Sequence, residues 1–100
     1  MRVTPQQISI IVQTARSVAG QDADVWLFGS RLSDSSRGGD VDLLIESKQP
    51  ATILQRARIK VELEQMLQLP FDVIATGRST QDSPFVAIAR ANAICISAQL

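Results

Sequence analysis

The chain of 100 residues carries ten basic and ten acidic side chains, so its formal net charge at neutral pH is zero. This balance argues against a broad basic surface for nucleic acid, and the length predicts a single domain, residues 1–100, with little material for a second lobe. With no histidine and one cysteine, the sequence argues against tetrahedral zinc sites and Ser-His-Asp catalysis, and it excludes an internal disulfide.

The first predicted element is a helix that begins after Thr4. Thr4 suits the N-cap, Pro5 the first helical position, and Gln7 the partner that completes a capping box. Apolar residues then follow helical spacing until Gly20, which predicts one face packed on a sheet. Residues 24–28 form the next element, a strand whose unbroken apolar run predicts cover on both faces.

A loop rich in serine, arginine and glycine follows, and a second strand is predicted over residues 41–46. We expect it to run antiparallel to the first strand because the connection is too short for a crossover helix. Asp40 and Asp42 stand at its start, and strand alternation places both on one face with Cα atoms roughly 6.5 to 7 Å apart. Glu46 shares that face but lies too far along the strand to join them, so we expect it to be solvated.

The paired carboxylates predict a divalent cation. Two such charges about 5 to 6 Å apart repel by roughly 3 kcal/mol at the effective dielectric of a protein surface, and a bound cation reverses that sign. Hard oxygen ligands select Mg²⁺ or Mn²⁺, and Mg²⁺ takes one or two carboxylates together with phosphate oxygens and water. A lone Asp-x-Asp is weak support by itself, since it is also common at solvated strand ends.

The turn before these acids predicts a phosphate site. Gly29 permits close approach of the backbone to a ligand, and Ser30 adds a hydroxyl beside its own N–H. Arg31 and Arg37 lie in the following loop, where a guanidinium can hold phosphate oxygens through two hydrogen bonds. Each of these four residues also has an ordinary interpretation, as a turn residue or a solvated loop charge.

A long helix is predicted from Pro50 and Thr52 to about Leu67, and Pro70 ends it. Its buried positions are expected to include Ile53, Leu54, Ala57, Val61, Leu63 and Leu67. Its charged residues are expected to face solvent, with Lys60 and Glu64 spaced for an i,i+4 pair.

A third strand is predicted over residues 71–75, where alternation turns Asp72 away from the core layer formed by its neighbours. A short helix begins at Ser83-Pro84 and runs to about Ala91, and residues 93–97 form an edge strand or a frayed tail. Together the elements predict an α/β (α+β) fold, a small mixed sheet of three or four strands with helices mainly on one face. The other face is free to present the carboxylates.

Phe28-Gly29-Ser30, the variable loop and Asp40-Val41-Asp42-Leu43 resemble the minimal bacterial nucleotidyltransferases, which are built like the palm of DNA polymerase beta. The resemblance covers nearly the whole chain, although Gly39 stands where many relatives have serine. It implies that Asp40 and Asp42 bind the metal that accompanies a nucleoside triphosphate. It also implies a third carboxylate, Asp72, that binds a second metal or draws a proton from the attacking hydroxyl. The ordinary alternative for Asp72 is a lysine partner or a turn cap.

The resemblance implies transfer of a nucleoside monophosphate, AMP from ATP first among the choices, to a hydroxyl with release of pyrophosphate. Because the chain is too small to enclose an acceptor, we expect a protein partner such as a HEPN-type toxin, or a second copy of the chain. The alternatives are a non-catalytic antitoxin that binds a nucleotide or partner, and an aminoglycoside nucleotidyltransferase. No N-terminal segment joins basic residues to a long apolar run, so we expect a cytoplasmic protein without membrane contact.

Overall fold

The structure is a computed structural model that describes residues 3–29, 40–78 and 81–99. The elements follow in the order α1 (Pro5–Ala19), β1 (Asp24–Phe28), β2 (Val41–Ser47), α2 (Ile53–Leu67), β3 (Phe71–Gly77), α3 (Pro84–Ala91), β4 (Ile94–Cys95) and the 3₁₀ helix η2 (Ile96–Gln99). The predicted helices and strands are therefore confirmed, with β2 and β3 longer than expected. None of the helices in these ranges is long and apolar enough to cross a membrane.

The helices begin where local sequence signals place them. The side chain of Thr4 accepts a hydrogen bond from the Gln7 N–H, and the Gln7 side chain accepts one from the Thr4 N–H. Thr52 and Gln55 form the same reciprocal pair at the start of α2. These capping boxes satisfy backbone donors that the first helical turn leaves without partners.

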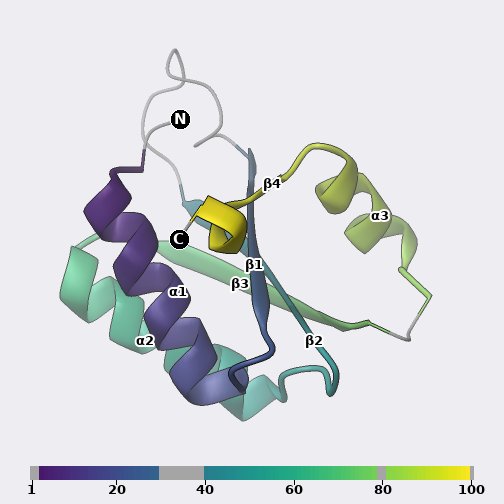
Figure 1. The fold of residues 1–100 in the computed structure, drawn as a ribbon, viewed down its shortest axis with the longest axis horizontal. Helices are drawn as coiled ribbons and strands as arrows, with labels where there is room; N and C mark the ends of the chain where they lie inside the picture. The colour runs from purple at the N-terminus through teal and green to yellow at the C-terminus, as the bar shows by residue number, and fades with distance from the viewer. Residues whose placement is uncertain (1–2, 30–39, 79–80, 100) are drawn as a thin grey trace.

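The four strands form one mixed sheet in the order β3-β2-β1-β4. β1 runs antiparallel to β2 and β4, whereas β2 and β3 are parallel because α2 carries the chain back across the sheet. Figure 1 shows α1 and α2 on one side of the sheet and α3 on the other. The predicted mixed fold is confirmed, and the open choice for the last segment resolves into a short edge strand followed by η2.

The main core lies between the sheet and the α1–α2 layer. Its members come from alternate positions of the strands and from the inner faces of both helices: Val25, Leu27, Val41, Leu43, Ile45, Phe71, Val73, Ile8, Ile11, Val12, Ile59 and Leu63. Alternation then turns the intervening strand residues toward α3. The face that was expected to present the carboxylates is therefore the α3 face.

The buried side of α2 differs from the prediction. Ile53 and Leu54 are 74% and 82% exposed, and Val61 is 50% exposed, whereas Ile59, which was not predicted to be buried, is fully buried. Leu63 is fully buried, as predicted. Leu67 packs partly against the core, as predicted, and Ala57 is exposed. Apolar residues occur all round this helix, so its spacing did not identify which side contacts α1 and the sheet.

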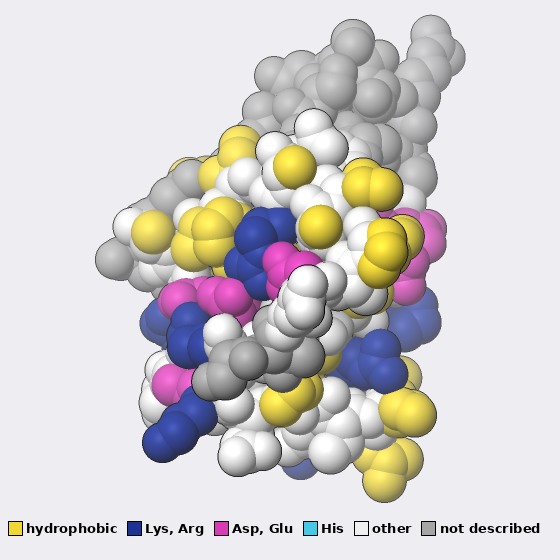
Figure 2. Space-filling view, turned by 90° about the vertical axis from the view of Figure 1, so that its right-hand side faces the viewer, with side chains coloured by type: hydrophobic (Ala, Val, Ile, Leu, Met, Phe, Trp, Pro, Cys, Tyr) yellow, Lys and Arg dark blue, Asp and Glu magenta, His cyan; other side chains and the backbone are white. Residues whose placement is uncertain are grey.

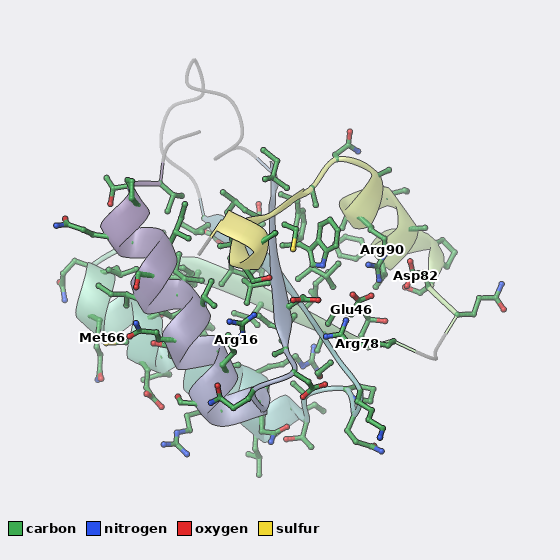
Figure 3. All side chains as sticks on the ribbon, viewed as in Figure 1. Arg16, Glu46, Met66, Arg78, Asp82 and Arg90 are labelled. Atoms are coloured by element: carbon green, nitrogen blue, oxygen red, sulfur yellow. The ribbon has the colours of Figure 1, made fainter. Side chains whose placement is uncertain are left out.

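Glu46 also differs from its prediction, because it is held in an ion-pair network and is not solvated. Its carboxylate lies 3.2 Å from Arg78 and 2.9 Å from Arg90. Arg90 extends from α3, pairs with Asp82 at 2.8 Å, and stands over the ring of Trp26 at 5.7 Å from the centroid. Figure 3 shows these charged side chains between the sheet and α3. The network fastens α3 to the sheet at a position that the strand pattern alone did not indicate.

The reassigned face of α2 can be tested by paired substitutions. We expect Ile59→Ala to lower the free energy of unfolding by about 2 to 5 kcal/mol, because it leaves a cavity in a packed core. Leu54→Ala should change it by less than about 0.5 kcal/mol, because that side chain is exposed. Urea unfolding followed by circular dichroism measures both, and the opposite ranking would restore the packing predicted from the sequence.

Candidate active site

The predicted carboxylates meet where three strands lie side by side. Asp42 of β2 is in register with Phe28 of β1 on one side and with Asp72 of β3 on the other. Neighbouring strands are about 4.8 Å apart, so Asp42 and Asp72 are direct neighbours on the α3 face of the sheet. Asp40 immediately precedes β2. Asp40 and Asp72 are exposed, and Asp42 is half-buried between them and Gly29.

Gly29 is required by this arrangement for two reasons. Its φ of +81° lies in the left-handed region, which strains any residue with a side chain. A Cβ atom at this position would also lie 2.9 Å from Cγ of Asp42 and would overlap its Oδ2. The absence of a side chain at Gly29 therefore makes the space that the Asp42 carboxylate occupies.

The acids repel one another. Partial burial raises the pKa of Asp42 above its ordinary value, and the negative charges of Asp72 and Asp40 raise this pKa further. The three groups are therefore close enough to interact, and burial and the neighbouring negative charges both disfavour the ionised form of Asp42. An added cation would relieve this repulsion.

The carboxylates do not form a complete metal cage. Within residues 3–29, 40–78 and 81–99, no three histidine, cysteine, aspartate or glutamate side chains are arranged to hold a metal ion by themselves. The donors that are present are carboxylate oxygens, which suit a hard cation, and Gly29 leaves room beside them. A cation here would take its remaining ligands from water and a substrate, as Mg²⁺ commonly does.

Lys60 and Glu64 hold the start of β3. The i,i+4 pair predicted from the sequence is confirmed, with 2.9 Å between Lys60 Nζ and Glu64 Oε2. Beyond that prediction, Glu64 accepts a hydrogen bond of 2.8 Å from the Phe71 N–H, and Lys60 donates one to the Phe71 carbonyl. Because β3 is an edge strand, these backbone groups have no strand partner on the outer side. The pair thus fixes the residue next to Asp72.

The negative charges of Asp40 and Asp72 also act on Lys60. Its pKa is raised first by the hydrogen bond to Glu64, against a smaller opposing effect of desolvation, and the charges of Glu64, Asp40 and Asp72 raise it further. The sequence contained the ion pair but no signal for this placement, since the distance between α2 and β3 is decided by packing. Lys60 is 46% exposed, so its attraction for the acids is screened by water.

The structure describes one of the four residues predicted for the phosphate site, and the roles of all four stay predictions. Gly29 lies beside Asp42 as required for a shared site. Ser30, Arg31 and Arg37 fall outside the described residues, and their roles stay predictions.

Residues 8–95 match the family model of the nucleotidyltransferase domain. No curated protein sequence shows significant similarity to the chain. Among solved structures, the fold is similar to the MNT antitoxin in the complex with tri-AMPylated HEPN toxin from Shewanella oneidensis, with a TM-score of 0.69 and 13% sequence identity. The similarity covers 91% of this chain and 69% of that chain. At this identity it supports the fold alone, and the family assignment rests on the match over residues 8–95.

The raised pKa of Asp42 leads to a prediction for the stability of the folded protein. Because its pKa is raised in the folded state, the charged carboxylate destabilises the protein at neutral pH, and this cost disappears as the pH falls through the folded pKa. We expect Asp42→Asn to increase stability at pH 7 by up to about 1 kcal/mol. In a domain of this size that corresponds to a rise in Tm of about 4 to 8 °C.

Thermal melting at several pH values, with added chelator, measures this effect. The advantage of Asp42→Asn should shrink as the pH approaches about 4, where the unfolded carboxyl also becomes protonated. Ser47→Ala, in the same strand but far from the acids, provides a comparison. A lower Tm for Asp42→Asn at pH 7 would contradict the repulsion.

Proposed function

Because the chain belongs to the nucleotidyltransferase domain family, we propose that it transfers AMP from ATP to a hydroxyl of a partner protein. The observation that best supports this is the Asp42 carboxylate, seated against Gly29 and in register with Asp72. In the reaction, the acceptor oxygen forms a bond with the α-phosphorus and the bond from this phosphorus to the bridging oxygen breaks. Pyrophosphate leaves, and the acceptor proton passes to a carboxylate.

The proposed roles follow from position and charge. The backbone and hydroxyl donors of Gly29 and Ser30 hold phosphate oxygens, and Arg31 and Arg37 add bidentate hydrogen bonds. Asp72 is exposed at the edge strand, where it can take the proton of the incoming hydroxyl. Lys60 and Glu64 keep the backbone at Asp72 in place through Phe71. Orientation and charge balance supply most of the catalysis in phosphoryl transfer.

Asp40 and Asp42 would hold Mg²⁺ or Mn²⁺, and Asp72 would share a second ion. A bound divalent cation neutralises negative charge on the phosphates and polarises the reacting phosphorus. The fit is supported by the carboxylate oxygen donors and by the raised pKa of Asp42, to which the negative charges of Asp72 and Asp40 contribute after partial burial.

A HEPN-type toxin is the proposed acceptor. The structurally similar MNT antitoxin is in complex with a HEPN toxin that is tri-AMPylated. That resemblance supports a related reaction here, and the open position of Asp72 leaves the acceptor to be supplied from outside the chain. Masking of the toxin without transfer is the competing function.

Transfer can be tested with labelled ATP, Mg²⁺ and a purified HEPN-type partner. We expect label on the partner and release of pyrophosphate, and EDTA should stop both. Asp42→Asn and Asp72→Asn should each reduce the rate by about 10² to 10³-fold, because each removes charge at the reacting centre. Equal transfer by the variants would exclude this mechanism.

The masking alternative has its own readout. If Asp40→Asn/Asp42→Asn neutralises the toxin as fully as the native chain, masking is sufficient and transfer is not the protective activity. If neutralisation is lost while binding to the toxin is kept, transfer is required.

Gly29 offers a further test, with Gly20 as a matched control. Both glycines have positive φ, +81° and +116°, but Gly20 follows α1 at the opposite end of β1. We expect Gly29→Ala to reduce transfer about as strongly as Asp42→Asn, because its Cβ displaces the carboxylate. Gly20→Ala should lower stability by about 1 kcal/mol or more and leave the rate of the folded protein unchanged. Initial rates and urea unfolding separate the two effects.

A further inference from the structure

A cavity of about 490 Å³ opens beside the carboxylates, between the end of β1 and α3. It is lined by Phe28, Gly29, Phe85, Ile88, Ala89 and Asn92. Gly29 lines this cavity and also lies directly beside the Asp42 carboxylate. Phe28, the preceding residue, is in register with Asp42. A ligand whose phosphates lie at Gly29 therefore has the cavity next to it.

The lining is suited to an uncharged, flat group. Among the residues that the structure describes, the lining contains two phenylalanines, one isoleucine and one alanine, and it includes no acidic or basic side chain. Phe85 and Ile88 are 60% and 66% exposed, which leaves apolar surface in water. Figure 2, which views the α3 side, shows hydrophobic side chains on this surface next to charged ones. Triphosphate oxygens would gain nothing from such walls, whereas an aromatic base would stack on them.

Asn92 supplies a polar group at the end of α3. Its side-chain nitrogen donates a hydrogen bond of 3.1 Å to the carbonyl of Ile88. Within the described part of the chain, the amide oxygen and the second N–H have no other hydrogen-bond partner, and an asparagine amide can form a pair of hydrogen bonds with adenine. A few polar groups in an otherwise apolar cavity are typical of small-ligand sites, whose volumes are about 300 to 1,000 Å³.

Ion pairs of Arg90 hold α3, which forms one wall of the cavity, in place. Arg90 of α3 pairs with Glu46 of β2 at 2.9 Å and with Asp82 at 2.8 Å. Arg90 also stands over Trp26 of β1, next to the strand end that carries Phe28. The ion pairs therefore fix the distance between α3 and the sheet, which sets the width of the cavity.

We propose that this cavity holds the nucleobase of the nucleoside triphosphate, with adenine stacked against Phe85 and Phe28 and its edge at Asn92. This inference rests on the proposed function and assigns the base-binding part of the same site. The ribose then spans the short distance to Gly29, and the phosphates reach the acids at Asp42. An apolar side chain of the acceptor protein is the competing occupant.

The test measures binding of ATP and of inorganic tripolyphosphate to the full chain in Mg²⁺. Phe85→Ala should weaken ATP binding by about 5- to 150-fold, the range that loss of base stacking produces, and leave tripolyphosphate binding unchanged. Because Phe85 is exposed, its removal is expected to leave the fold intact. Leu54→Ala, which removes an exposed apolar side chain from α2, should change neither affinity.

Base selectivity gives a second readout. The native chain should bind ATP more tightly than UTP, and Asn92→Ala should reduce this ratio by about 5-fold or more through loss of the amide contact. A ratio of affinities is insensitive to a general loosening of α3. An unchanged ratio would overturn the assignment of Asn92.

The outcomes separate this inference from the proposed function. If Phe85→Ala leaves ATP binding intact but weakens binding of the protein partner, the cavity holds the acceptor and the base assignment is wrong. Equal weakening of ATP and tripolyphosphate would also overturn it. If ATP binding depends on Phe85 and no AMP is transferred to any partner, the base site stands and the proposed transfer fails.

Discussion

The close contact between the Asp42 carboxylate and the backbone at Gly29 is the constraint on which the site depends. It joins the end of β1 to the start of β2, and the parallel pairing of β2 with β3 then adds Asp72. The Asp42 carboxylate can occupy this position only because residue 29 lacks a side chain and takes a positive φ. One backbone position thus couples the fold of the sheet to the placement of its charges.

The electrostatics of the site are unfavourable for the ionised form of Asp42. Three acids lie together with Asp42 partly removed from water, and among the described residues the charge of Lys60 acts on Asp40 and Asp72 from an exposed position. Such local instability is common where side chains are arranged for a substrate or an ion. The main core, on the opposite side of the sheet, is apolar and packed, and it provides the stability that the charged face lacks.

Two groups of polar side chains bring outlying elements to this face. Lys60 and Glu64 satisfy the outward backbone groups of Phe71, so that the edge strand carrying Asp72 is held by α2. Arg90 holds α3 through Glu46 on the other side. The first group links α2 to the edge strand β3, the second links α3 to β2, and together they border the proposed nucleotide site.

Local patterns in the sequence determined the helix starts at Thr4 and Thr52, the strands, and the pair Asp40 and Asp42 at a strand start, because capping and alternation involve near neighbours. The prediction for the buried side of α2 was right for Leu63 and Leu67 and wrong for Ile53, Leu54, Ala57 and Val61. Glu46 was expected in solvent and lies in an ion-pair network. Only the tertiary structure decided that Ile59 faces the core, that Asp72 lies beside Asp42, and that α3 borders a cavity next to Gly29. These features depend on the register and packing of segments far apart in the chain, which short-range spacing does not encode.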